Sequence, residues 1–276
     1  MTTSIRNNNL FQRHVALPSD HGSWVFLLSP LLIGLFAGNS WSIAAIFLII
    51  TALSAFLLRQ PITVAVKVYS GRRHKRDLPA AWFWIGIYGL VATLGLVGLI
   101  SQGFAYLLIL ALPGIPVFSW HLYLVSRRAE RRQLGVEIVA SGVLALAAPA
   151  GYWIGVGSLD PVGWLLLALT WLQSAASIVY AYLRLEQREL DSIPDLSTRL
   201  SKGRRALIYT SFNLFFVITL GLVDLVSPLL VLPYTLQLVE AIWGTINPAI
   251  GIRPTAIGIR QLIISSLFTL LFILAW

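Results

Sequence analysis

One stretch of the sequence joins a long apolar segment to dense charge. It covers residues 184–195 and reads R-L-E-Q-R-E-L-D-S-I-P-D. Arg184 and Arg188 are four residues apart, so on a helix their guanidinium groups share one face. Neighbouring guanidinium groups can hold a phosphate or a carboxylate through paired hydrogen bonds. The stretch therefore predicts a binding site for an anion.

A second basic face follows an earlier apolar segment. Arg59, Thr63 and Lys67 recur every four residues, which places them on one face of a helix. They could complete the anion site together with Arg184 and Arg188. The alternative is that the two cations simply reach from the end of an apolar helix toward water.

A third basic cluster, R-R-A-E-R-R, begins with Arg127 and Arg128 and includes Glu130. The two arginines are further candidates for binding an anionic ligand. Glu130 is a candidate for proton transfer, and its alternative role is to neutralise the surrounding arginines.

Two other residues are candidates for proton transfer. His21 lies in L-P-S-D-H-G-S-W, and histidine titrates near neutral pH without a perturbing environment. Its alternative setting is a helix cap next to an interfacial aromatic anchor, Trp24. Glu186, the second candidate, lies within the first basic stretch.

Glu240 is the acidic residue most clearly inside an apolar segment, and ionisable residues at membrane depth usually face a cavity.

Metal sites are not expected. The sequence contains no cysteine and four scattered histidines, which excludes the usual zinc and iron–sulfur ligand sets. Asp191 and Asp195 have a spacing that suits magnesium and diphosphate on a helix, but Pro194 between them disfavours a continuous helical face. We therefore predict no cofactor and no magnesium.

The composition is that of a membrane protein. Of 276 residues, 57% are hydrophobic and 11% are charged, against about 45–50% and about 25% in soluble domains. The mean hydropathy is +0.80. A net charge of +9 fits basic residues that flank membrane spans and contact anionic lipid, so a nucleic acid partner is not expected.

Nine apolar segments are long enough to cross a bilayer, at roughly 20 residues each. This predicts an all-α, polytopic bundle of nine transmembrane helices, at 22–38, 40–58, 80–101, 103–126, 135–157, 160–186, 204–223, 226–246 and 257–276.

The basic residues predict the orientation of these helices. All 20 Lys and Arg residues lie in the N-terminal tail, residues 1–21, or in the connections after the even-numbered segments. By the positive-inside rule the tail is cytoplasmic, and nine spans place the C-terminus on the far side. Within a single membrane domain, 22–276, long basic connections after the second and sixth segments indicate two repeats, 22–134 and 135–256, followed by a last helix.

Three sequence blocks resemble a known family. The blocks L-P-S-D-H-G-S-W, R-R-A-E-R-R and I-R-P-T-A-I-G-I-R resemble the YwiC-like family of uncharacterised bacterial membrane proteins, over most of the chain. The resemblance implies the bacterial cytoplasmic membrane, or an internal membrane continuous with it. No activity comes with this resemblance.

The helix layout is more distantly similar to the UbiA superfamily of intramembrane prenyltransferases. In that superfamily the two long loops carry aspartates that bind magnesium and diphosphate, and the second motif typically follows a Tyr-Ala dipeptide. Here Tyr180-Ala181 precedes the basic stretch. The positions that resemble the aspartates hold Arg59, Thr63, Lys67, Arg184 and Arg188. Guanidinium and ammonium groups have no lone pair for magnesium, so a standard magnesium-dependent prenyl transfer is not expected.

The leading functional hypothesis is the binding of an amphipathic isoprenoid or lipid with an anionic head at the cytoplasmic face. A quinone precursor or a pigment is a further ligand class. If the protein also transforms this ligand, it is a metal-independent enzyme that uses one of the three proton-transfer candidates. One alternative is a non-catalytic subunit or assembly factor that binds other membrane proteins. Another is a small-solute transporter with Glu240 in its pathway.

Overall fold

The computed structural model describes residues 10–18, 22–39, 41–129 and 133–276, and all regular secondary structure in these ranges is helical. The chain divides into two compact units. Unit 1 contains Met1–Asp20 and Trp41–Gln133, and unit 2 contains His21–Ser40 and Leu134–Trp276. The division falls next to the predicted repeat boundary at residue 134 but assigns the first apolar helix to the second half of the chain. The internal repeat stays a prediction.

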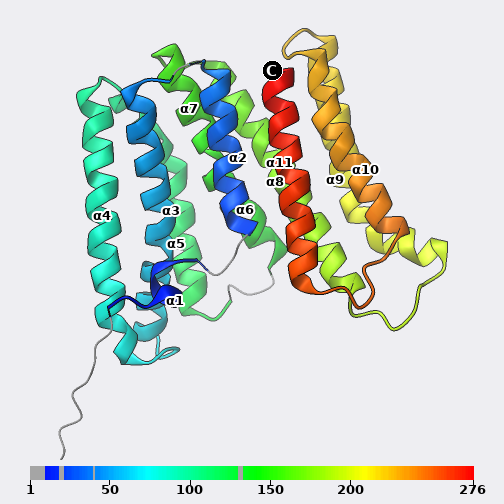
Figure 1. Ribbon diagram of the computed structural model, residues 1–276, viewed down its shortest axis with the longest axis horizontal. Helices are drawn as coiled ribbons and strands as arrows, with labels where there is room; N and C mark the ends of the chain where they lie inside the picture. Colours follow the sequence, from blue (N-terminus) through cyan, green and yellow to red (C-terminus); the bar gives the residue numbers. More distant parts are fainter. Residues whose placement is uncertain (1–9, 19–21, 40, 130–132) are drawn as a thin grey trace, which may run out of the picture. The chain divides into compact units, whose positions relative to one another are not determined.

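Unit 1 is built on a hairpin of two long helices, α3 and α4, which lie side by side in Figure 1. A short N-terminal segment covers one end of this hairpin, where Val15 is completely buried. The indole of Trp84 donates a hydrogen bond to the Leu10 carbonyl at 3.1 Å, and the Gln60 amide donates to the His14 carbonyl at 2.9 Å. The elements are α1 (Arg13–Ala16), α3 (Ile43–Tyr69), η1 (Lys75–Asp77), α4 (Leu78–Ser101), η2 (Ala105–Leu110) and α5 (Ala111–Ser126).

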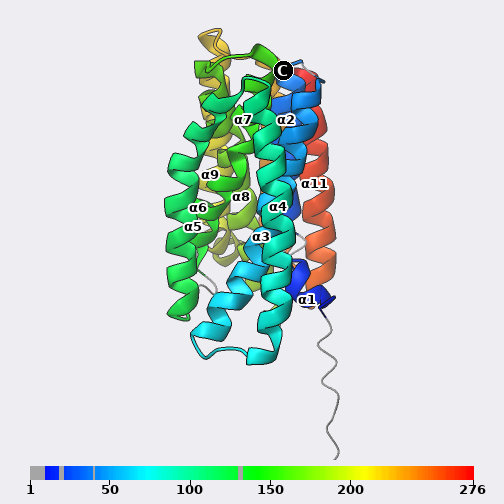
Figure 2. The same cartoon turned by 90° about the vertical axis from the view of Figure 1, so that its left-hand side faces the viewer.

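Unit 2 is arranged around α8, which is the most buried of the long helices. Helices α2, α6, α7, α9, α10 and α11 all contact it, and Figure 2 shows α8 behind α6 and α7. The elements are α2 (Gly22–Ala37), α6 (Leu134–Ala145), α7 (Ala147–Val156), α8 (Pro161–Gln187), α9 (Leu196–Leu222), η3 (Pro228–Leu230), α10 (Val231–Ile246) and α11 (Pro254–Ala275).

The described residues contain eight helical segments that are long and apolar enough to cross a membrane. The protein is therefore a multi-pass membrane protein with a helical bundle, as the sequence predicts. Helix α2 is a shorter apolar helix of 16 residues. Its length of about 24 Å falls short of the roughly 30 Å hydrocarbon core. The count of nine spans, which includes α2, stays a prediction.

Two helices extend well beyond the predicted apolar segments. Helix α3 continues to Tyr69 instead of ending at residue 58, and α9 begins at Leu196 instead of residue 204. The predicted limits of these two helices were set where the run of apolar residues begins or ends. A basic residue ends the apolar stretch but does not break a helix, because lysine and arginine are good helix formers.

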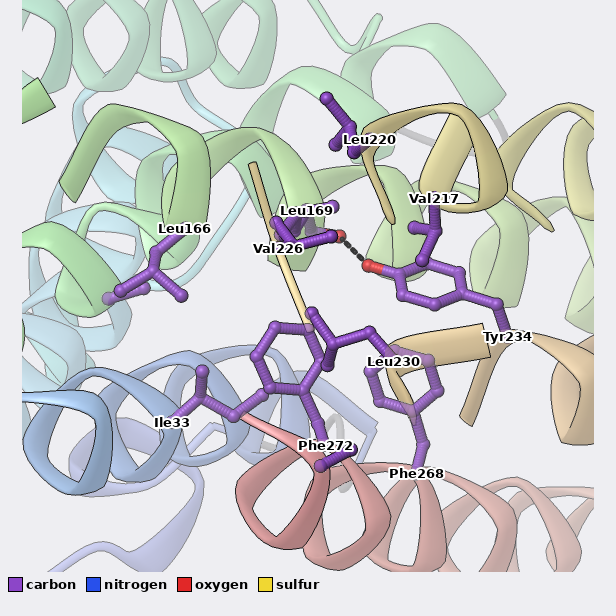
Figure 3. Close-up of a cluster of buried hydrophobic side chains, with 12 residues drawn as sticks. Ile33, Leu166, Leu169, Val217, Leu220, Val226, Leu230, Tyr234, Phe268 and Phe272 are labelled. Atoms are coloured by element: carbon purple, nitrogen blue, oxygen red, sulfur yellow. Dashed lines mark hydrogen bonds between the residues drawn. The ribbon is translucent and has the colours of Figure 1, made fainter. Parts of the chain in front are cut away.

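The interior of unit 2 is apolar toward one end of its helices. Figure 3 shows this cluster, in which the hydroxyl of Tyr234 donates to the Leu169 carbonyl at 3.0 Å. The cluster lies away from the helix ends at residues 187, 196, 246 and 254, which carry the basic connections and are called the basic end below. Its labelled members are Ile33, Leu166, Leu169, Val217, Leu220, Val226, Leu230, Tyr234, Phe268 and Phe272.

Helices α2 and α7 approach each other through glycines. A Cβ atom on Gly34 would lie 2.1 Å from the carbonyl oxygen of Ala148, and one on Gly155 would lie 2.0 Å from the carbonyl oxygen of Gly38. Small residues at a helix interface allow backbones to come this close, and the contact is then held by van der Waals packing.

We predict that Gly34→Ala destabilises unit 2 by about 1–3 kcal/mol, because the added methyl group forces two backbones apart. Thermal unfolding in detergent micelles would measure the change. The matched control is Gly258→Ala in α11, where no atom lies within 4 Å of the added carbon. A melting temperature that is equal for the two variants would contradict the close α2–α7 contact.

Candidate functional site

One face of α8 is polar and buried over its second half. The residues recur at intervals of three and four, which places them along a single helical stripe. Each is at most 8% exposed. The stripe consists of Thr170, Gln173, Ser177, Tyr180, Arg184 and Gln187. The polar interior of unit 2 therefore lies toward the basic end, and the apolar cluster lies toward the other.

Arg184 joins α8 to the end of α10. Its guanidinium is buried, and Nη1 donates hydrogen bonds to Gln187 Oε1 at 2.9 Å, to the Gly244 carbonyl at 2.8 Å and to the Asn247 carbonyl at 2.6 Å. The last carbonyls of a helix have no partner within it and carry partial negative charge, so a cation there is stabilising. All hydrogen bonds from Arg184 to described residues use Nη1. Its Nε and Nη2 make none with that part of the chain.

Glu240 lies inside α10 and binds two other helices. Arg260 of α11 donates to both carboxylate oxygens, from Nε at 2.6 Å and from Nη2 at 2.7 Å. The hydroxyl of Tyr180 donates to Oε1 at 2.8 Å. The side chain of Glu240 is 7% exposed, whereas that of Arg260 is 43% exposed. The arginine also stacks on Trp243, with its guanidinium carbon 3.5 Å from the ring centre.

A cavity of about 550 Å³ lies among α8, α10 and α11. Its polar lining is Tyr180, Arg184, Arg260 and Gln261, and much of the remaining wall is formed by Trp243 and five isoleucines, Ile252, Ile257, Ile259, Ile263 and Ile264. The ion pair lies six residues from the ends of α10 and α11, which is about 9 Å of helix. The site holds two guanidinium groups and one carboxylate, so it carries one excess positive charge.

The other predicted residues of the basic stretch lie away from this cavity. Arg188 is half-buried at the C-cap of α8 and does not line the cavity. Glu186 is exposed and forms an ion pair with Lys202 at 3.1 Å. Asp195 caps α9 and accepts hydrogen bonds from Thr198, which lower the pKa of its carboxyl group.

The predicted residues of unit 1 also have specific surroundings. Thr63 donates to the Arg59 carbonyl at 2.8 Å, and the guanidinium of Arg59 lies 5.4 Å from the Phe56 ring. Lys67 is half-buried in the last turn of α3. The pairing of this face with Arg184 and Arg188 stays a prediction, because the two groups belong to different units.

Arg127 and Arg128 are exposed at the end of α5, where Arg127 lies over the ring of Tyr123 at 5.5 Å. Two proton-transfer candidates, His21 and Glu130, lie outside the described residues. The predicted roles of all four residues stay predictions.

Arg260 was not predicted as a site residue. From its charge it was predicted to lie in the basic connection after the eighth apolar segment, whereas it lies about two turns inside α11. A signal was present, because a carboxylate at membrane depth needs a cation at a similar depth. Arg260 is the only Lys or Arg inside α11.

The comparisons with known proteins concern mostly the first half of the chain. The family model described as YwiC-like protein matches residues 17–152. This match places residues 17–152 in the YwiC-like family. The chain is similar to "Uncharacterized protein YwiC" of Bacillus subtilis (strain 168), with 28% identity over 165 residues, which is 58% of this chain and 61% of that protein.

No solved structure matches the chain. The similarity to the UbiA superfamily stays a prediction. The residues that form the cavity of unit 2 all follow residue 152, so they lie beyond the part that matches the YwiC-like model.

We predict that Glu240 and Arg260 contribute to the stability of the protein as a pair, so that the effects of replacing them are not additive. Arg260→Gln leaves a buried carboxylate without its cation and should cost about 2 kcal/mol of stability. The partial exposure of Arg260 keeps the loss below that of a fully buried pair. Glu240→Gln should cost less, because the freed guanidinium can reach water.

The double variant Glu240→Gln/Arg260→Gln should be more stable than Arg260→Gln alone. Chemical denaturation in mixed micelles would measure all four proteins. The coupling would be contradicted if the losses in free energy of unfolding of the two single variants add up to the loss of the double variant to within about 0.5 kcal/mol.

Proposed function

We propose that this membrane protein binds an amphipathic lipid or isoprenoid with a singly charged anionic head in the cavity among α8, α10 and α11. One observation carries the proposal. The cavity combines an excess positive charge with walls of isoleucine and tryptophan. We also propose that its basic end faces the cytoplasm of a bacterial cell, which is supported by the positive-inside rule.

The charge balance supports an anionic head. Arg260 is compensated by Glu240, whereas Arg184 meets only neutral acceptors. A charge removed from water is unfavourable unless it is paired. Arg184 lines the cavity, and its Nε and Nη2 make no hydrogen bond to the described residues. A phosphate or carboxylate at this position would therefore neutralise the site.

The apolar walls support a hydrocarbon tail. Ile259 and Ile263 of α11 line the cavity and are 59% and 54% exposed. In a transmembrane helix such positions face lipid, so the cavity is open to the bilayer along α11. A ligand that diffuses within the membrane could enter without crossing water.

The packing of unit 2 favours binding over transport. The polar stripe of α8 does not continue past Thr170 toward the other end of the helix, where Leu166 and Leu169 are completely buried. A solute pathway would need polar or open space there. The apolar cluster of Figure 3 fills this part of unit 2.

We predict that Arg184→Gln reduces the amount of anionic lipid that copurifies with the protein. The loss of a charge-assisted hydrogen bond, about 1.5–3 kcal/mol, corresponds to roughly tenfold weaker binding or more. Mass spectrometry of lipids extracted from protein purified in a mild detergent would measure the ratio of lipid to protein. Arg188→Gln is the matched control, since Arg188 does not line the cavity.

A second variant separates ligand binding from stability. Ile264→Trp should fill the cavity without removing a charge and should also lower the lipid content. If both cavity variants retain as much anionic lipid as the wild type, the proposed function is wrong.

A further inference from the structure

A small polar chamber borders Glu240. It is lined by Ala176 and Ser177 of α8, Thr210 of α9, Gln237 and Glu240 of α10, and Gln261 of α11, with further contacts. Its volume is about 10 Å³, close to the roughly 10–15 Å³ that one water molecule needs. The chamber is therefore large enough for one water molecule but not for a lipid head.

Gln237 brings an unpaired acceptor to this chamber. Its side chain is 7% exposed, and Nε2 donates to the Gln173 carbonyl at 2.9 Å and to Ser177 Oγ at 3.1 Å. The Gln173 carbonyl can only accept, so it defines the orientation of the amide. The buried oxygen Oε1 then accepts no hydrogen bond from the described residues. A buried amide oxygen without a donor is destabilising.

The hydroxyl groups of the chamber complete a hydrogen-bonding set. Ser177 Oγ accepts from both Gln173 Nε2 and Gln237 Nε2, so its hydrogen can point into the chamber. Thr210 donates to the Ala206 carbonyl at 2.9 Å, which leaves lone pairs on its oxygen. Buried water molecules typically make about three hydrogen bonds to such groups.

We propose that this chamber is a binding site for one water molecule, which accepts from Ser177 and donates to Gln237 Oε1. Tyr180, Gln261 and Ile264 line both the chamber and the larger cavity. The water site thus borders both the larger cavity and Glu240. The inference does not depend on the proposed lipid ligand.

A structure determined in lipid nanodiscs, at a resolution that shows ordered water, tests the site directly. We expect density within hydrogen-bond distance of Gln237 Oε1. A chamber without density, in a map that shows buried water elsewhere, would overturn the proposal.

Stability measurements provide a second test. Ala176 is fully buried and lines the chamber, so Ala176→Val occupies the space of the water. If water is bound, this change leaves Gln237 Oε1 unpaired and should lower the melting temperature by about 2–4 °C. In a Gln237→Leu background the amide oxygen of residue 237 is absent, so the same change should have a smaller effect. A rise in the wild-type background, or an equal shift in both backgrounds, would overturn the proposal.

Discussion

The polar interior of unit 2 depends on one buried carboxylate. An unpaired charge at the depth of Glu240 would be strongly unfavourable, so the residue requires a cation and hydrogen-bond donors from its neighbours. Arg260 supplies the cation and Tyr180 supplies a hydroxyl, at 2.6 Å and 2.8 Å. These contacts join α8, α10 and α11 at one level. Arg184 then holds the end of α10 against α8 nearby.

This arrangement separates two environments within one helical unit. Toward the basic end, α8 presents amides, hydroxyls and a guanidinium to its neighbours, and the helices do not close completely. Toward the other end, aromatic and aliphatic side chains such as Trp153 and Phe272 are fully buried, and the indole of Trp153 donates its hydrogen bond to the Asp160 carbonyl. Unit 2 therefore has a tightly packed half and a charged half that contains the cavity.

Part of the candidate site could be predicted from the sequence. Arg184 was recognised by its position at the end of an apolar segment, and it is the member of the predicted clamp that lines the cavity of unit 2. Its partner Arg188 was chosen on helical spacing alone. The spacing of four residues holds, but Arg188 is the C-cap residue, where α8 ends. Arg260 was missed because charge alone assigns a basic residue to a connection and not to a helix.

The sequence alone determined the class of this protein. Apolar segments of membrane length and basic residues confined to alternate connections predict a helical membrane protein, because hydrocarbon requires every backbone group to be paired within a helix. The tertiary structure decided which polar residues meet. Glu240 and Arg260 are 20 residues apart, and Tyr180 is 60 residues from Glu240. Periodicity places each residue on a face of its own helix, but only the packing of three helices decides which faces come together.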